Sequence, residues 1–281
     1  MKFPRFAYTC PAALPAALAV LAADDEAVAM AGGQSLLPML SFRVVRPNRL
    51  VDIARLPELQ RIEMTANTLR IGAGVTHAQI EDGALPGALG VFLARAAGGI
   101  AFRAIRNRGT VGGSLAHADP AADWPVVFAA LGASVETAGS DGLRSLSISE
   151  LIEDQMQTTL QPGELITSIS VPVAGWSRFG LHKSARKAGE FADALAVATV
   201  GADGLRIWVG VIAGRPVRLV ADVDPAELRP DRRLSNTASY AALLSAIEVA
   251  APGVAPYRAH LSAIAACRAV SQAYSEEGVV R

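Results

Sequence analysis

The spacing of apolar residues predicts an α/β arrangement at the start of the chain. Apolar residues recur on one face over residues 12–23, with the period of a helix. Short apolar runs at Ala27–Ala31 and Leu50–Ile53 are typical of buried strands, and a further strand is predicted at Arg43–Val45. Together these elements predict a small α/β lobe over residues 1–57.

The pattern then changes to an alternation of apolar and polar residues, which predicts hairpins. Arg61–Met64 and Leu69–Ile71 alternate on the two sides of a turn, and Ser134–Thr137 begins a second hairpin. Leu165–Val171 alternates as a single strand. We assign these strands to a second lobe, residues 58–174. Its expected helices cover residues 76–82, 89–97 and 120–131.

The last third of the chain combines strand-like segments with alanine-rich helices. The expected strands are 179–183, 194–200 and 205–211, and the expected helices are 236–250 and 256–273. This order predicts a three-stranded sheet packed on helices over residues 175–281. The chain as a whole is therefore expected to have an α+β fold.

A glycine-rich segment, Gly109–Ser114, is the first candidate binding element. Gly112 and Gly113 carry no Cβ, so the main chain there is free to adopt positive φ and to bring its amides close to an anion. Ser114 adds a hydroxyl, and Pro120 suits the first turn of the helix that follows. The segment is a candidate phosphate site, although the same glycine pair is also typical of an ordinary tight turn.

A second glycine segment, Ala31–Leu36, repeats this arrangement of strand, glycine turn and a polar residue that opens a helix. Two such segments in one chain indicate a ligand with two phosphates, each held by main-chain amides instead of lysines. A Rossmann site is excluded, because the chain has no G-x-G-x-x-G motif at a strand–helix junction and Gly72-Ala73-Gly74 lacks the third glycine.

Charge and cysteine content narrow the class of protein. The chain has 26 Lys and Arg against 26 Asp and Glu, so it has no global positive field to attract nucleic acid or an anionic membrane. Cys10 and Cys267 are the only cysteines, and an iron–sulfur cluster takes about four thiolates. Any such cluster is expected on another polypeptide, and the scarcity of cysteine fits a cytoplasmic protein.

The apolar N-terminus has two interpretations. Lys2 and Arg5 precede an alanine-rich stretch, as they do in a short signal peptide. We favour a folded helix, because Pro11 and Pro15 suit its first turn and a strand follows at the spacing of a folded domain. No apolar run approaches the roughly 20 residues that span a membrane.

The segments Ala31–Leu36 and Ile105–Ser114, followed by Asp123 and Glu164–Ile166, resemble in order and separation the flavoprotein subunit of the molybdenum hydroxylases. That family includes the medium subunits of carbon monoxide dehydrogenase and of bacterial N-heteroaromatic hydroxylases, and the central domain of xanthine dehydrogenase. The resemblance covers nearly the whole chain. It implies a two-lobed vanillyl-alcohol-oxidase-like (PCMH-type) FAD-binding fold, followed by a C-terminal three-stranded sheet with helices.

The resemblance also implies roles for single residues. Asp123 matches an FAD-contacting aspartate, and Lys183 matches a lysine near the flavin ring, where a cation stabilises negative charge on the reduced flavin. Ile100 and Phe191 match residues that pack on the flavin faces, although many relatives have a tyrosine at the second position. FAD is expected to be noncovalent, because no histidine or cysteine is well placed to attach it. The residues expected to hold it are Ala31, Gly32, Gly33, Gln34, Ser35, Leu36, Ile100, Thr110, Val111, Gly112, Gly113, Ser114, His117, Asp123, Ile166, Lys183 and Phe191.

Several of these residues also have a purely structural interpretation. Asp123 complements the N-terminus of the helix that it opens. Lys183 is at a position where a lysine is commonly solvated, and Ile166 is equally suited to the core. Arg106 and Arg108 either position the glycine segment or face a partner, and the sequence leaves both roles open.

The resemblance implies an electron-transfer role within a larger enzyme. A large molybdopterin-binding subunit oxidises an N-heteroaromatic or related small molecule, and a small subunit with two-iron two-sulfur clusters passes the electrons to FAD, which delivers them to an external acceptor. The expected assembly is a dimer of heterotrimers. Two alternatives stay open: a self-sufficient FAD oxidase, and a structural component that binds FAD without reducing it.

This chain itself offers no evident catalytic acid, base or nucleophile for a substrate, as expected for a relay. A metal site of His117, Asp119 and Asp123 lacks a fourth ligand, so no metal is expected here.

Overall fold

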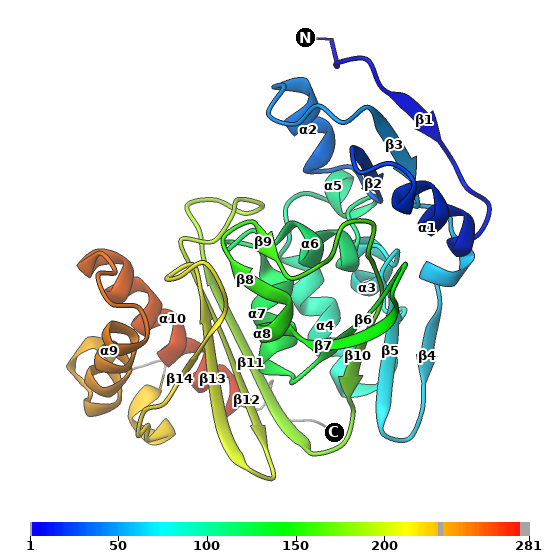
Figure 1. Cartoon of the computed structure of the whole chain (residues 1–281). Helices are drawn as coiled ribbons and strands as arrows, with labels where there is room; N and C mark the ends of the chain where they lie inside the picture. The colour runs from blue at the N-terminus through cyan, green and yellow to red at the C-terminus, as the bar shows by residue number, and fades with distance from the viewer. Residues whose placement is uncertain (1, 230–232, 276–281) are drawn as a thin grey trace.

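The computed structural model describes residues 2–229 and 233–275, which form three main sheets in succession along the chain (Figure 1). The first sheet is parallel and has the order β1-β3-β2. Two helices complete this N-terminal lobe, which lies apart from the C-terminal helices. Its elements are β1 (Ala7–Thr9), α1 (Leu14–Ala22), β2 (Ala27–Met30), α2 (Leu36–Ser41) and β3 (Arg49–Asp52).

The strand expected at Arg43–Val45 is absent, so that prediction was wrong. Arg43 follows the last turn of α2 and adopts φ 58°, in the left-handed region, which ends the helix and is incompatible with a strand. The position beside β3 is taken by β1, in which Tyr8 is the partner of Leu50. β1 was missed because its three residues show no apolar alternation.

The second sheet is antiparallel and has the order β4-β5-β10-β6-β7, so the two expected hairpins flank the late strand β10. β8 and β9 lie between β7 and β10 in the chain and form a separate two-stranded hairpin. The strands are β4 (Ile62–Met64), β5 (Thr68–Gly72), β6 (Ser134–Gly139), β7 (Gly142–Ser147), β8 (Ile152–Asp154), β9 (Gln157–Thr158) and β10 (Leu165–Pro172). The helices are η1 (Pro57–Leu59), α3 (His77–Glu81), α4 (Gly87–Gly98), α5 (Arg103–Arg106), α6 (Val111–His117), α7 (Asp123–Ala130) and α8 (Ile148–Leu151).

The helix expected to start near Pro120 begins at Asp123 instead. Ala118 ends α6 in the left-handed conformation, with φ 51°. A turn closed by the bond from the Ala122 amide to the Asp119 carbonyl then separates α6 from α7. Asp123 is therefore the first residue of α7, and its carboxylate belongs to the first turn, as expected from the sequence.

The third sheet has four strands, in the order β11-β12-β13-β14, where three were expected. The added strand, β14, has three residues and pairs with β13 at the edge of the sheet. The elements of this region are β11 (Trp176–Ser184), β12 (Ala194–Gly201), β13 (Gly204–Gly210), β14 (Val217–Leu219), η2 (Pro225–Leu228), η3 (Leu234–Asn236), α9 (Ala238–Ala250) and α10 (Pro256–Ala273).

The third sheet is covered by α10 on one side and by α7 on the other (Figure 1). α10 packs closely because small residues face the sheet: a Cβ on Gly180 would lie 1.9 Å from the Ala269 carbonyl oxygen. On the α7 side, a Cβ on Gly210 would lie 2.6 Å from Val126 Cγ2. α7 thus packs on the third sheet and also contacts α4, α6 and α8, and it carries Asp123 at its first turn.

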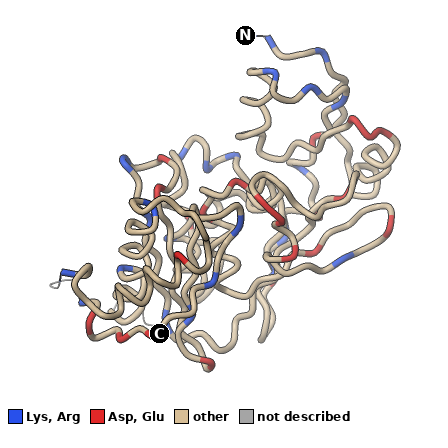
Figure 2. Tube along the Cα trace, turned by 60° about the vertical axis from the view of Figure 1, so that its left-hand side comes forward, with Lys and Arg blue, Asp and Glu red and all other residues tan. Residues whose placement is uncertain are grey.

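Basic and acidic residues are interspersed along the trace in Figure 2, in keeping with the balanced charge of the sequence. None of the helices in the described ranges is long and apolar enough to cross a membrane.

The packing of α10 leads to a first prediction, a comparison of two glycine-to-alanine variants. Gly180→Ala is expected to lower the free energy of unfolding by about 1–3 kcal/mol, because the new methyl group forces α10 away from β11. Gly98→Ala is the control: its Cβ meets nothing closer than Glu81 Oε1 at 3.6 Å. The control should change stability by less than about 1 kcal/mol. Urea unfolding measures both, and equal stabilities would contradict the packing argument.

Candidate functional site

A cavity of about 730 Å³ lies where the three sheets approach one another. Both glycine segments line it, together with residues of β10 and of the β11–β12 connection. Every residue expected at the FAD site lines this cavity except Val111, which is fully buried on the inner side of α6. The structure therefore brings together residues that are more than 150 positions apart in the chain.

The segment Ala31–Leu36 presents free main-chain donors. Gly33 adopts φ 73°, in the left-handed region that favours glycine. The amides of Gly33, Gln34 and Ser35 donate to no acceptor within the described part of the chain. The Gln34 side chain turns back and donates to the Gly32 carbonyl at 3.0 Å. Consecutive free amides around a left-handed residue are suited to an anion, and the phosphate site predicted for this segment stays a prediction.

The segment Gly109–Ser114 is built differently, and the expectation for its amides was wrong. Within it, the Gly112 amide donates to the Ala73 carbonyl at 2.9 Å and the Gly113 amide to Thr110 Oγ1 at 3.1 Å. Its other amides beyond Thr110 are bonded as well, to the carbonyls of Val75 and Thr110. Neither glycine has positive φ, because both lie inside α6. What this segment offers a ligand is the Thr110 amide, which has no acceptor among the described residues, and the side-chain hydroxyls of Thr110 and Ser114.

The two glycine segments pack backbone against backbone. A Cβ on Gly32 would lie 2.1 Å from the Arg108 carbonyl oxygen and 2.9 Å from Gly109 Cα. A Cβ on Gly112 would lie 2.4 Å from the Ala73 Cβ. Glycine is therefore required at both positions: Gly32 lets the two segments meet, and Gly112 lets α6 approach the Ala73 loop.

Asp123 and Lys183 form a buried ion pair at the cavity. Lys183 Nζ lies 3.0 Å from Asp123 Oδ2 and donates to the Gly99 carbonyl at 3.0 Å. Burial raises the pKa of Asp123 above its usual range, against the opposing charge and hydrogen bond of Lys183. The other carboxylate oxygen, Oδ1, is buried and has no hydrogen-bond partner among the described residues. An unpaired acceptor at a cavity wall is suited to a ligand that donates a hydrogen bond.

His77 is a cavity residue that the sequence did not single out. Its ring is 6% exposed, and Trp124 Nε1 donates to its Nδ1 at 3.0 Å. Burial, with the charge of Arg106 as a second cause, lowers the pKa of His77 to about 4, so the ring is neutral at pH 7. The local signal was Thr76, which caps α3 through a capping box with Gln79. His77 is then the first residue of the helix, and it is buried.

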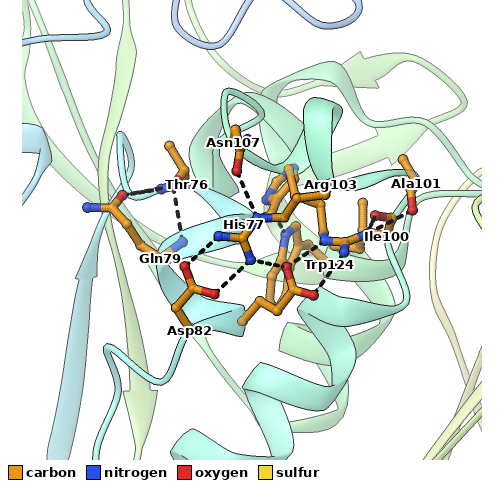
Figure 3. A network of polar contacts seen from close by, with 11 residues as sticks. Thr76, His77, Gln79, Asp82, Ile100, Ala101, Arg103, Asn107 and Trp124 are labelled. Carbon is orange, nitrogen blue, oxygen red and sulfur yellow. Dashed lines mark hydrogen bonds and ion pairs between the residues drawn. The ribbon is translucent and has the colours of Figure 1, made fainter.

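A network of ion pairs holds the segment that precedes the second glycine segment (Figure 3). Arg106 donates to both oxygens of Glu81 and to the carbonyls of Ile100 and Ala101, and the bond from Arg106 lowers the pKa of Glu81. Ala101 has φ 44°, so Arg106 stabilises a left-handed turn at the cavity edge. Arg106 therefore positions the loop. Arg108 is exposed, with no ion pair in the described ranges.

Two phenylalanines form an apolar rim at the cavity mouth. Phe102 is 64% exposed and Phe191 is 66% exposed, and both line the cavity. Phe191 lies in the connection between β11 and β12, close to Gly189, where a Cβ would come within 2.8 Å of the Phe102 ring. Of the other apolar lining residues, Ile100 is half-buried and Ile166 is buried. These side chains offer flat contacts to an aromatic ring system.

No group of three His, Cys, Asp or Glu side chains is arranged to hold a metal ion in the described part of the chain. Asp119, considered as a ligand from the sequence, accepts a bond from the Ala121 amide at 2.8 Å.

Comparisons with known proteins agree with this geometry. Residues 4–174 match a family model described as the FAD binding domain in molybdopterin dehydrogenase. The medium subunit of nicotine 6-hydroxylase from Paenarthrobacter nicotinovorans is 35% identical, over 88% of this chain and 90% of its own length. Quinoline 2-oxidoreductase from Pseudomonas putida 86 contains a chain of similar structure, with a TM-score of 0.81, 32% identity and coverage of 97% and 98%. Carbon monoxide dehydrogenase from Hydrogenophaga pseudoflava contains another, with a TM-score of 0.83, 29% identity and coverage of 98% and 99%.

The pKa of His77 leads to a second prediction, about stability and pH. The unfolded chain binds a proton at His77 below about pH 6.5, but the folded chain does so only below about pH 4. The free energy of unfolding therefore falls as pH is lowered through this window, by about 1.4 kcal/mol per pH unit for this group. His77→Asn, which keeps an acceptor for Trp124, should remove that part of the slope. Urea unfolding of both proteins at several pH values gives the difference, and a constant difference would contradict the prediction.

Proposed function

The chain belongs to the FAD-binding domains of molybdopterin dehydrogenases, the medium subunits of the molybdenum hydroxylases, and we propose that it serves as their electron relay. FAD is its cofactor, and the complexes of this family are oxidoreductases. The expected two-lobed PCMH-type fold is confirmed by the likeness to carbon monoxide dehydrogenase. In the proposed role, electrons reach the flavin from iron–sulfur clusters on a partner and leave to an external acceptor.

The observation that carries this proposal is the mixture of donors and acceptors around one cavity. The free amides of Gly33–Ser35 suit an anionic pyrophosphate. The unpaired Asp123 Oδ1 suits a hydroxyl or ring N–H of the same molecule. Bound FAD supplies the chemistry of accepting and passing on electrons. The protein's own residues bind and orient it.

We assign further roles to the remaining cavity residues. Lys183 is held by Asp123 and by the Gly99 carbonyl, so its charge is fixed at the cavity wall, where it stabilises an anionic ring. Ile100 and Ile166 pack against the ring, and Phe191 covers it at the mouth. Lys183 and Asp123 Oδ2 are bonded to each other, so we assign this pair to binding the cofactor and not to acid–base chemistry on an organic substrate.

The partners follow from the same proposal. The two cysteines, Cys10 exposed and Cys267 buried, are single in the structure, so the clusters belong to a small iron–sulfur subunit and the molybdenum cofactor to a large one. We propose a dimer of such heterotrimers in the cytoplasm. An N-heteroaromatic substrate for the whole enzyme is supported by the names of the relatives, among them nicotine 6-hydroxylase and caffeine dehydrogenase.

We also propose a division of the chain into two FAD-binding lobes, 1–57 and 58–174, and a flavoprotein C-terminal domain, 175–281. Residue 1 and residues 276–281 lie outside the described ranges. The order of the three main sheets supports these boundaries.

Asp123→Asn tests the proposed contact with FAD. The oxygen of the new side-chain amide still accepts from Lys183. The NH₂ group that replaces Oδ1 no longer accepts a bond from FAD. Losing a hydrogen bond to a charged group costs about 1.5–3 kcal/mol, so the dissociation constant should rise about ten- to hundredfold. Titration of the apoprotein with FAD measures it.

Glu164→Gln is the matched control for Asp123→Asn. Glu164 is also a buried carboxylate at the cavity, but its two oxygens accept from Thr137, Arg144 and the Gln161 amide. Its loss should lower stability and leave the affinity for FAD within a few-fold. Equal effects of the two variants on affinity would reject a direct contact at Asp123.

The relay is tested anaerobically. The isolated chain is mixed with candidate N-heteroaromatic substrates, the flavin absorbance is followed, and the molybdenum and iron–sulfur subunits are then added. We expect bleaching only after the partners arrive, because the chain has no substrate acid–base group and no cluster. Bleaching before they arrive would instead show a self-sufficient oxidase. A flavin that stays oxidised in the complete, turning-over complex would show a structural component.

A further inference from the structure

His77 is a buried hydrogen-bond donor that faces the cavity. Because Trp124 Nε1 donates to Nδ1, the single proton of the neutral ring is on Nε2. Nε2 has no hydrogen-bond partner within the described ranges. Since Trp124 engages Nδ1, the Nε2–H is the polar group that His77 can offer to the cavity that it lines.

His77 Nε2 packs beside the second glycine segment, close to where the two glycine segments meet. A Cβ on Gly109 would lie 2.8 Å from His77 Nε2, and a Cβ on Gly32 would lie 2.9 Å from Gly109 Cα. Nε2, Gly109 and Gly32 are thus packed in succession. The free amides of Gly33–Ser35 follow Gly32 directly in the chain. His77 is on the side of the cavity where those donors lie.

The cavity has little positive charge with which to hold a pyrophosphate. Among its described lining residues Lys183 is the single lysine or arginine, and it is engaged by Asp123 and the Gly99 carbonyl. Two phosphate groups must therefore be held mainly by neutral donors. The amides of Gly33–Ser35 are one set, whereas the amides of residues 111–114 in the second glycine segment are already bonded within the chain.

We propose that His77 is a further FAD-binding residue, whose Nε2–H donates to a phosphate oxygen of the cofactor while Trp124 fixes the tautomer that makes this possible. The inference rests on the proposed function in one respect, that FAD occupies this cavity. Trp124 is adjacent to Asp123 on α7, so the same imidazole links the phosphate side of the cavity to the helix that carries the buried carboxylate.

Two amide variants separate the donor role from mere support of Trp124. His77→Gln is long enough to place an N–H near the position of Nε2, whereas His77→Asn is one carbon shorter and places its oxygen near Nδ1, as an acceptor for Trp124. In apoprotein titrated with FAD, His77→Gln should bind within about threefold of the wild type. His77→Asn should bind about ten- to hundredfold more weakly, because a hydrogen bond to a charged group is lost. Equal affinities, or the reverse order, would overturn the proposal.

A second measurement follows the His77 ring directly in the wild-type protein, and a variant serves only to assign its signals. The chain has four histidines, so the ¹⁵N-histidine NMR spectrum of the wild type is simple to assign, with His77→Asn identifying the His77 signals. FAD should shift the Nε2–H proton of His77 and slow its exchange with water. An unchanged His77 signal in a protein that has bound FAD would reject this inference and leave the proposed function intact. Wild-type protein that binds no FAD would contradict the proposed function itself.

Discussion

The contact between Gly32 and the Arg108–Gly109 backbone is the constraint on which the rest of the site depends. The hypothetical Cβ of Gly32 would overlap the Arg108 carbonyl, so the two glycine segments meet without an intervening side chain. This contact joins the loop after β2, a strand of the first sheet, to the loop between α5 and α6. Because the loops touch, the free amides of one and the hydroxyls of the other face the same cavity.

The sequence identified the two glycine segments of the cavity lining, because their signal was local: glycine pairs after a strand and before a helix. It did not distinguish the two segments. Whether the Gly112 amide is free depends on the Ala73 carbonyl, which comes from a loop nearly forty residues earlier. The same non-local packing explains His77, whose role comes from Trp124 on another helix. The short strands β1 and β14 were missed because three residues carry too little periodicity to predict an element.

Most of the charged side chains that line the cavity have an ion-pair partner. Lys183 is paired with Asp123, and of the other carboxylates in the described lining Glu164 is paired with Arg144 and Glu190 with Arg186. Neutral donors hold an anion in a fixed geometry and are insensitive to salt, unlike exposed lysines. The Arg106–Glu81 pair acts on the cavity indirectly. Arg106 donates to the carbonyls of Ile100 and Ala101 and so holds the loop at the cavity edge.

Helix α7 connects the cavity to the C-terminal domain. Its first residue, Asp123, pairs with Lys183 from β11, and Val126 packs against Gly210 at the end of β13. Removing the Lys183 side chain alone would leave the Asp123 carboxylate buried without its cation, which is strongly unfavourable. A ligand that donates to Asp123 Oδ1 therefore stabilises the docked arrangement of the two regions as well as its own binding. We expect the affinity for a cofactor and the packing of the third sheet on α7 to be coupled through this ion pair.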